Sequence, residues 1–195
     1  MTKFINNEFI DTYRKTTGVN YMDKSYNLAT TDIIEFSIYD LGGDPEYQNM
    51  LPLAVSDSLA ICYCFDLTKK ESLVNVERWW KLTKIANENP DIVPVLIGTK
   101  YDLFVEKSLE YQEEMYIDSL KYAKALGSPI IFTSAAKSVN IQKILKVVTG
   151  LAFDLKNIDL PQFSRFGEPI LIFKKVLIDG ILLEYYNSSN AASSR

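Results

Sequence analysis

Residues 92–102 read Ile-Val-Pro-Val-Leu-Ile-Gly-Thr-Lys-Tyr-Asp, and this stretch decides the fold. Its first part, Ile92–Gly98, is an almost unbroken apolar run, which is typical of a strand buried on both faces of a parallel sheet. Polar side chains follow at once, namely Thr99, Lys100 and Asp102. In doubly wound α/β sheets, ligands bind where the strands end at their carboxyl edges. The stretch therefore predicts both a parallel sheet and a polar site at its edge.

Strand-like and helix-like segments alternate on both sides of this stretch, between residues 30 and 156. The other strand-like runs are Ile33–Leu41, Leu59–Leu67 and Pro129–Thr133. The segments with helical spacing of apolar residues are Lys70–Ala86, Leu109–Leu126 and Ile141–Leu155. Gly127 follows the second of these helices, where a glycine C-cap is expected. From Leu59 to Leu155 the order is βαβαβα, which predicts an α/β domain with a mostly parallel sheet and crossover helices.

Three further segments lie outside this alternation. Val19–Leu28 predicts an extra edge strand, joined to the next strand by a hairpin around Ala29–Thr31. Residues 157–186 contain two apolar runs around Asp179 and Gly180, a turn signal typical of a hairpin. The last nine residues are rich in Ser, Asn and Ala and predict a disordered tail. The predicted organisation is a domain over residues 1–156, a C-terminal extension over 157–186 and a tail over 187–195.

The composition excludes several classes of function. The 195 residues carry a net charge of -4, and the sequence pI is about 5.0. Binding to nucleic acid needs a basic face, so we expect no nucleic-acid partner. The chain contains no histidine. This excludes histidine acid–base catalysis, a Ser-His-Asp triad and a histidine-ligated metal.

Other features of the sequence favour a cytoplasmic protein. Cys62 and Cys64 lie two residues apart in an apolar run, which predicts that they share one strand face as small hydrophobic side chains of a reduced core. No signal peptide and no apolar stretch of membrane-spanning length is present. The final residues, Ala-Ala-Ser-Ser-Arg, offer no cysteine for prenylation, so we expect no lipid anchor.

Residues with binding chemistry also follow two more of the predicted strands. Asp40 and Gly43 come after one strand, and Ser134 and Ala135 come after another. A carboxylate at a strand end can hold Mg²⁺ through water, and a glycine lets a backbone N–H approach a phosphate closely. The Asp102 carboxylate can accept hydrogen bonds from N1 and the exocyclic amine of guanine, whereas adenine offers no such pair of donors.

Each of these residues has a plainer interpretation when it is taken alone. Asp40 is then an N-cap or turn residue, and Ser134 is a helix N-cap. Lys100 and Asp102 are then part of a solvated loop, although the stem of Lys100 is also able to lie flat along a base. Their combination at consecutive strand ends favours a nucleotide site over these separate interpretations.

The order and spacing of four motifs resemble those of the Ras superfamily of small GTPases over residues 1–156. Asp40–Gly43 matches the DxxG motif of that family. Thr99–Asp102 matches its guanine-recognition motif, with Thr in place of the usual Asn. Ser134-Ala135 matches its SA motif, and Thr16 matches its switch I threonine. The resemblance implies a Ras-like fold of the type found in P-loop NTPases.

The resemblance also implies a role for each matched residue. Thr16 and Asp40 correspond to the Mg²⁺ ligands, and Thr16 also senses the γ-phosphate. Phe9 stands where the family has an aromatic side chain against the base. The nucleotide-binding residues implied in this way are Phe9, Thr16, Gly43, Thr99, Lys100, Asp102, Ser134 and Ala135. The implied cofactors are GTP or GDP and Mg²⁺.

Four segments are similar to the fungal septum-promoting and mitotic-exit branch of this superfamily. They are residues 66–70, 98–104, 140–144 and 167–173. The resemblance implies GTP binding and hydrolysis as a signalling switch in septation, cytokinesis or mitotic exit. It also implies an exchange factor, an activating protein and a protein-kinase-type effector as partners, and recruitment to the spindle pole.

Two departures from the family pattern affect this interpretation. The 195 residues contain no G-x-x-x-x-G-K-[ST] motif, so we expect the first strand and the phosphate loop to be missing from this chain. Asp44 stands at the position of the glutamine that orients the attacking water, although an inert exposed turn residue is the plainer interpretation. An alternative function is therefore open: a non-catalytic pseudo-GTPase interaction protein, or a truncated gene product with little nucleotide binding. A flavodoxin-like binder shares the fold class but does not account for Thr99–Asp102 and Ser134-Ala135 together.

Overall fold

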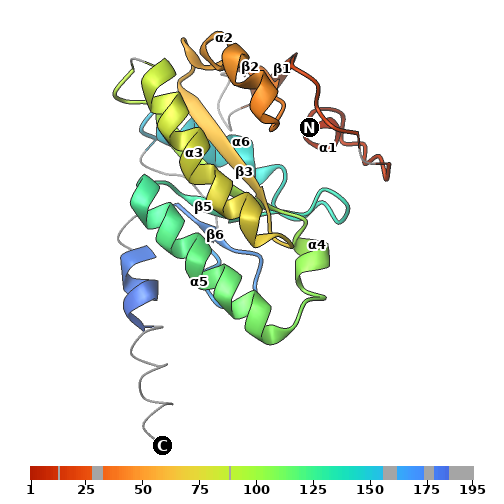
Figure 1. The fold of residues 1–195 in the computed structure, drawn as a ribbon, viewed down its shortest axis with the longest axis vertical. Coiled ribbons are helices and arrows are strands. Elements are labelled where there is room, and N and C mark those ends of the chain that lie inside the picture. The colour runs from red at the N-terminus through yellow and green to blue at the C-terminus, as the bar shows by residue number, and fades with distance from the viewer. Residues whose placement is uncertain (13, 28–32, 88, 156–161, 174–177, 185–195) are drawn as a thin grey trace, which may run out of the picture.

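The computed structural model describes residues 1–12, 14–27, 33–87, 89–155, 162–173 and 178–184. These residues form an α/β fold, which confirms the predicted class (Figure 1). The strands belong to two sheets within the described part of the chain. The first sheet is an antiparallel pair of β1 (Val19–Asn27) and β2 (Ile33–Leu41), in which Val19 lies opposite Leu41.

The second sheet carries the predicted alternation of strands and helices. Its strands, in spatial order, are β3 (Ala60–Asp66), β4 (Val93–Thr99), β5 (Ile130–Phe132) and β6 (Leu171–Ile172). The first three are parallel, and β6 pairs antiparallel with β5. No strand of the described residues pairs with the second edge of β3, so β3 is an edge strand here.

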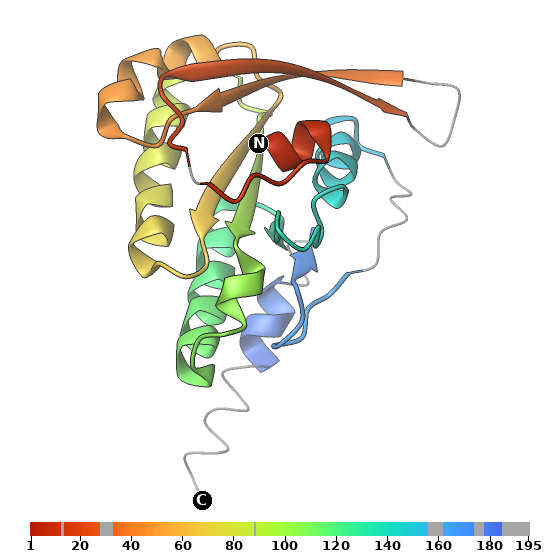
Figure 2. The same cartoon turned by 90° about the vertical axis from the view of Figure 1, so that its right-hand side faces the viewer.

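Helices cover both faces of the second sheet. The longer ones are α3 (Lys70–Ala86), α5 (Leu109–Leu126) and α6 (Lys143–Ala152). The shorter ones are α1 (Thr2–Asn6), the 3₁₀ helix η1 (Pro45–Met50), α2 (Leu51–Val55), α4 (Tyr101–Phe104) and a helix over residues 178–184. Helices α3 and α5 lie side by side on one face, whereas α6 lies on the other, beneath the long β1–β2 ribbon (Figures 1 and 2).

The alternation of side chains along β4 explains why both faces are covered. Leu96 belongs to the hydrophobic cluster that contains residues of α3 and α5. Its neighbours Val95 and Ile97 belong to the cluster that contains residues of α6. Successive side chains of a strand point to opposite faces. The apolar run that predicts a strand buried on both sides therefore corresponds to two separate clusters, one on each face.

Two of the three helices predicted from apolar spacing have the predicted bounds. The structure has α3 and α5 at the predicted bounds, and Gly127 adopts φ 63° as the C-cap of α5. Its N–H is donated to the carbonyl oxygens of Ala123 and Lys124. Helix α6 is shorter than the predicted 141–155 at both ends, since it runs from Lys143 to Ala152. The predicted turn at residues 29–31 and the predicted tail at 187–195 lie outside the described residues.

Two sequence predictions are wrong, one about secondary structure and one about side-chain burial. Residues 178–184 form a helix rather than part of a hairpin, because Ile178 and Leu182, four residues apart, bury one helix face in the α3–α5 cluster. Cys62 and Cys64 share a strand face as predicted, but both are exposed rather than buried. The α6 cluster covers β4 and β5, and it leaves this part of the edge strand open.

The first testable prediction concerns β6, which lies beyond residue 156 but within the core. Leu171 is 0% exposed, so Leu171→Ala should lower the free energy of unfolding by about 2–5 kcal/mol. Leu183 is 64% exposed, and the same substitution there should change it by less than about 0.5 kcal/mol. Urea unfolding followed by circular dichroism measures both. Equal effects of the two substitutions would show that β6 is not part of the cooperative core.

Candidate functional site

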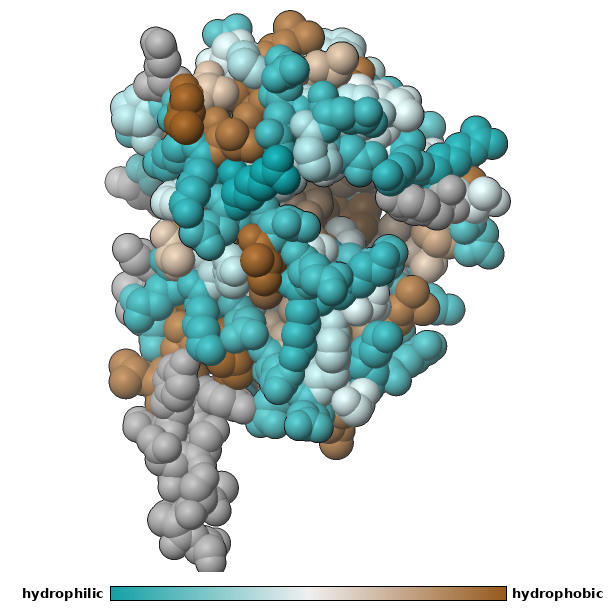
Figure 3. Space-filling view, viewed as in Figure 1, coloured by the Kyte–Doolittle hydropathy of each residue, from teal (hydrophilic) through white to brown (hydrophobic). Residues whose placement is uncertain are grey.

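The register of the parallel strands brings their carboxyl ends to one edge of the sheet. Asp66 at the end of β3 lies opposite Thr99 at the end of β4, and Gly98 lies opposite Phe132 at the end of β5. The N–H of Thr133 is donated to the carbonyl of Gly98 at 2.7 Å, which continues the ladder past β5. The arrowheads of β3 and β4 mark this edge near the middle of Figure 2, and the space-filling view shows a hollow in the surface (Figure 3).

Two predicted site residues from neighbouring strand ends are in direct contact. The hydroxyl of Ser134 is donated to Oδ1 of Asp102 at 2.5 Å. Asp102 lies in the first turn of α4, and Ser134 is fully buried. An ionised carboxylate has about four lone-pair positions. Asp102 can therefore hold Ser134 and still accept two hydrogen bonds from a ligand.

The backbone of Lys100 has a conformation that is uncommon for a side chain of its size. It adopts φ 61° and ψ 40°, the left-handed region, which costs a non-glycine residue on the order of 1–3 kcal/mol. Its carbonyl accepts the N–H groups of Leu103 at 3.1 Å and Phe104 at 3.0 Å. Its ammonium group forms an ion pair with Asp66 at 2.7 Å. These contacts hold the Lys100 side chain at the strand ends.

Asp66 is a functional candidate that the sequence analysis did not identify. Its side chain is only 13% exposed, and Oδ1 accepts both the N–H and the hydroxyl of Thr68, at 2.9 and 2.7 Å. Burial raises the pKa of Asp66, but the hydrogen bonds from Lys100 and Thr68 lower that pKa by more, so the carboxyl group stays ionised. Asp66 follows an apolar run, as Asp40 does, and this position in the sequence could have identified it as a candidate site residue.

A second group of predicted residues meets where residues 15–18 pass the end of β2. The hydroxyl of Thr16 is donated to Oδ2 of Asp40 at 3.3 Å, and the N–H of Gly42 to the carbonyl of Gly18 at 2.8 Å. A Cβ atom at Gly42 would lie 2.5 Å from the carbonyl oxygen of Thr16. Only glycine permits this approach at position 42. The next residue, Gly43, is exposed.

The donor chemistry of Thr16 and Asp40 fits Mg²⁺. Both contribute hard oxygen atoms, which Mg²⁺ prefers, and Mg²⁺ usually keeps several waters while binding only one or two protein groups. The described residues contain no group of three or more acidic, cysteine or histidine side chains suited to a metal ion. A Mg²⁺ ion does not need such a group, because one carboxylate, one hydroxyl, water and a ligand can hold it.

Asp44, at the predicted glutamine position, takes part in an ion pair. Nζ of Lys15 lies 2.6 Å from Oδ2 of Asp44. Asp44 precedes η1 as its N-cap residue and makes no capping hydrogen bond with its side chain. The two side chains are 64% and 35% exposed, and a pair this exposed contributes at most about 1 kcal/mol. The ion pair thus links the segment before β1 to the segment after β2.

The remaining predicted site residues are Thr99, Ala135 and Phe9. Thr99 donates its hydroxyl to the carbonyl of Phe65 at 2.8 Å, which fixes the end of β4 against β3. Ala135 is half-buried beside Ser134. Phe9 is 48% exposed in a segment with neither helix nor strand. Its contact with a base therefore stays a prediction.

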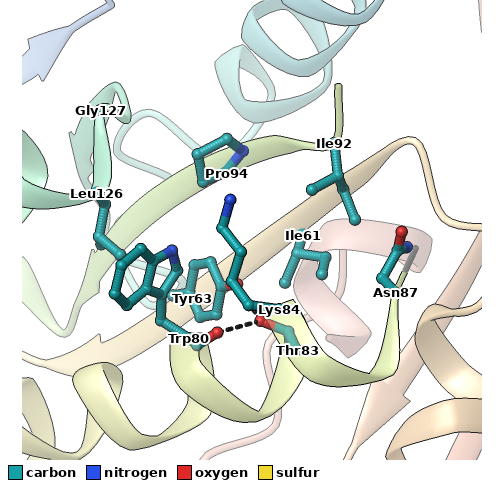
Figure 4. Close-up of a pocket in the computed structure, with 10 residues that line it drawn as sticks. All are labelled: Ile61, Tyr63, Trp80, Thr83, Lys84, Asn87, Ile92, Pro94, Leu126 and Gly127. Carbon is teal, nitrogen blue, oxygen red and sulfur yellow. Dashed lines mark hydrogen bonds between the residues drawn. The ribbon is translucent and has the colours of Figure 1, made fainter. Parts of the chain in front are cut away.

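A cavity of about 190 Å³ lies at the opposite end of the sheet (Figure 4). Its lining includes Pro94 near the start of β4, Ile61 near the start of β3, and Trp80 and Lys84 of α3. In Figure 4 the Trp80 carbonyl accepts the hydroxyl of Thr83 beside it, at 2.9 Å. The predicted motifs lie at the carboxyl ends of the strands, so this cavity is not the candidate nucleotide site.

Sequence comparison with known proteins identifies the family of the chain. The sequence profile of the Ras family matches residues 1–152. The chain belongs to the Ras family. This Ras-family chain is 40% identical over 171 residues to septum-promoting GTP-binding protein 1 of Schizosaccharomyces pombe, covering 88% of the chain and 84% of that protein. It is 24% identical over 148 residues to Ras-related protein Rab-31 of Homo sapiens, covering 75% and 72% respectively.

These similarities confirm the predicted family and its position near the septation branch. They also confirm the Ras-like fold class. The roles of individual site residues in this Ras-family chain rest on the geometry above and are proposals. Among the helices that the structure describes, none is both long enough and apolar enough to cross a bilayer.

The second testable prediction concerns the ion pair of Asp66. Asp66→Asn should lower the free energy of unfolding at pH 7 by about 1.5–3 kcal/mol, since the amide keeps an acceptor oxygen but loses the charge that pairs with Lys100 and strengthens the bonds from Thr68. The folded-state pKa of Asp66 lies below its ordinary value of 3.8. Its contribution is therefore complete above that ordinary value and is lost as the pH falls through the folded-state pKa. Urea unfolding at pH 7 and pH 3 should show a smaller difference between wild type and variant at pH 3.

The matched control is Asp118→Asn, which removes an exposed pair with Lys121. That change should have little effect at either pH. A difference for Asp66→Asn that is the same at pH 7 and pH 3 would mean that the charge of Asp66 does not stabilise the fold.

Proposed function

We propose that the chain is a small GTPase that binds guanine nucleotide at the carboxyl edge of its strands. The contact between Asp102 and Ser134 carries this proposal, since it joins two predicted base-recognition motifs that are 32 residues apart. In this proposal the Asp102 carboxylate accepts from guanine N1 and the exocyclic amine. The stem of Lys100 lies along the base, and the backbone of Ser134 and Ala135 meets the guanine oxygen.

The phosphate side of the proposed site consists of the residues after β2 and before β1. Thr16 and Asp40 hold Mg²⁺, and the N–H of Gly43 approaches a phosphate, which its exposure and lack of a side chain permit. Mg²⁺, when bound, neutralises charge on the phosphate oxygens. Thr99 keeps the end of β4 in place, and Phe9 contacts the base.

The proposed reaction is slow GTP hydrolysis, because Asp44 is a poor substitute for glutamine. An ionised aspartate only accepts hydrogen bonds, whereas glutamine both donates and accepts. At about 4 Å and an effective dielectric of 20, repulsion between Asp44 and a phosphate charge is on the order of 4 kcal/mol. The ion pair with Lys15 offsets part of that repulsion. An activating protein would then supply the group that orients the water.

The proposed biological role is a signalling switch in septation, cytokinesis or mitotic exit. Similarity to a protein named for septum promotion supports it. The partners that follow from the role are an exchange factor, an activating protein and a protein-kinase-type effector, with recruitment to the spindle pole. The second candidate function is a non-catalytic pseudo-GTPase that acts through protein contacts, which the aspartate at position 44 favours. Nucleotide binding and hydrolysis assays separate the two.

The third testable prediction concerns base specificity. Asp102→Asn should weaken GDP binding by roughly 10- to 150-fold, the equivalent of about 1.5–3 kcal/mol, and should improve binding of xanthosine diphosphate. Asparagine can donate to the second carbonyl of xanthine, which aspartate cannot. Competition by GDP, XDP and ATP for a fluorescent nucleotide measures this. Asp91→Asn, at an exposed carboxyl before β4, is the control that should change nothing. Wild-type protein that binds ATP as well as GDP would contradict the proposal.

The fourth testable prediction concerns the hydrolytic step. Asp44→Gln should raise the single-turnover rate of GTP hydrolysis by at least about tenfold, since it restores a donor that is worth on the order of 1.4 kcal/mol or more in the transition state. Asp44→Asn removes the charge without restoring the reach of glutamine, so it separates the two causes. No increase with either variant would show that Asp44 is an inert turn residue.

A further inference from the structure

The segment over residues 162–173 contacts the first of the two proposed base-recognition loops. Tyr101, inside the Thr99–Asp102 motif, donates its hydroxyl to the carbonyl of Gly167 at 2.9 Å. The N–H of the same tyrosine is donated to the carbonyl of Thr133 at 2.9 Å. One residue of the guanine motif is thus bound on one side to the C-terminal segment and on the other to the loop that holds Ser134.

The same segment also contacts the second loop. The N–H of Phe132 is donated to the carbonyl of Ile170 at 2.7 Å. The buried amide of Asn140 donates to the carbonyl of Phe132 at 2.9 Å and to that of Pro169 at 3.0 Å. These bonds enclose the turn in which Ser134 and Val139 exchange backbone hydrogen bonds at 3.1 and 3.0 Å. Both ends of the Ser134 turn are therefore held by residues 169–170.

The carbonyl groups that accept these bonds are themselves fixed. Ile170, Leu171 and Ile172 are all 0% exposed, and β6 continues the sheet beside β5 (Figure 2). Gly167 adopts φ 89°, a conformation that other residues adopt at a cost. The ring of Tyr101 packs against the ring of Phe132, and the two ring centroids are 6.4 Å apart. The segment is anchored in the core and is therefore able to hold the loops that it contacts.

We infer that residues 167–172 are a positioning element for guanine recognition, acting through Tyr101 on Asp102 and through Asn140 on Ser134. The inference rests on the proposed function, in which Asp102 and Ser134 meet the base. Loops already held in their binding geometry lose less conformational freedom when a ligand binds, which raises affinity. The carboxylate of Asp102 must meet two donors of the base at once, so its position also controls the choice between bases.

The chain offers a matched pair of variants that separates positioning from simple stabilisation. Tyr116 of α5 donates its hydroxyl to the carbonyl of Ser164 at 2.7 Å. This bond ties the same segment to α5 and involves neither loop. Tyr101→Phe and Tyr116→Phe each remove one hydroxyl and keep the ring. Only the first loses a bond to a base-recognition motif.

The test has two measurements on the full chain. In the absence of nucleotide, Tyr101→Phe should speed hydrogen exchange at the amides of Tyr101 and Ser134 by about fivefold, the equivalent of one typical hydrogen bond. With nucleotide, it should raise the Kd for GDP about fivefold. The Kd for inosine diphosphate, which lacks the exocyclic amine, should rise less, so that selectivity for guanine falls. Tyr116→Phe should leave both loop amides and the selectivity unchanged, whatever it does to the melting temperature.

The results distinguish this inference from the proposed function. If both variants speed exchange at the loop amides equally, or if Tyr101→Phe leaves those amides unchanged, the positioning role is overturned. If wild-type protein does not bind GDP, the proposed function fails by itself. Faster exchange in Tyr101→Phe alone still supports a segment that positions the two loops.

Discussion

Parallel pairing of β3, β4 and β5 is the constraint on which the rest of the structure depends. It places Asp66 opposite Thr99 and Gly98 opposite Phe132, so the polar residues after each strand meet at one edge. The close packing of this edge requires glycine at position 98. A Cβ atom there would lie 2.9 Å from side-chain carbons of Leu67 and Phe132. Core packing and the geometry of the site are therefore set by the same contacts.

At this edge, pairs of polar side chains contact one another directly. Asp66 holds the ammonium group of Lys100, and Asp102 holds the hydroxyl of Ser134. The left-handed backbone of Lys100 costs energy, and such conformations persist only where the surrounding structure determines them. Partly buried charges interact more strongly than charges in water. Together these contacts fix the side chains of Lys100 and Asp102, two of the proposed base-recognition residues, at the strand ends.

The sequence predicts those parts of the fold that depend on local patterns. The bounds of α3 and α5 follow from helical spacing and, for α5, from Gly127. The ion pair of Lys100 with Asp66 joins residues 34 positions apart, and the bond from Tyr101 to Gly167 joins residues 66 positions apart. No local pattern specifies which distant group a side chain will contact. The hairpin predicted around Asp179 is wrong for a related reason. Residues 178–184 form a helix because burying one helix face against distant helices overrides the local turn preference.

Chemical-shift mapping by NMR tests the central claim most directly, because it reports binding and location in one experiment. The measurement is the titration of ¹⁵N-labelled protein with GDP and Mg²⁺. We expect the largest amide shifts at residues 99–102 and 133–135, followed by residues 16–18 and 40–44 on the phosphate side. The amides of Asn87 and Gly127, which line the cavity at the opposite end of the sheet, should not move. Shifts confined to that cavity, with none at the strand ends, would contradict the account.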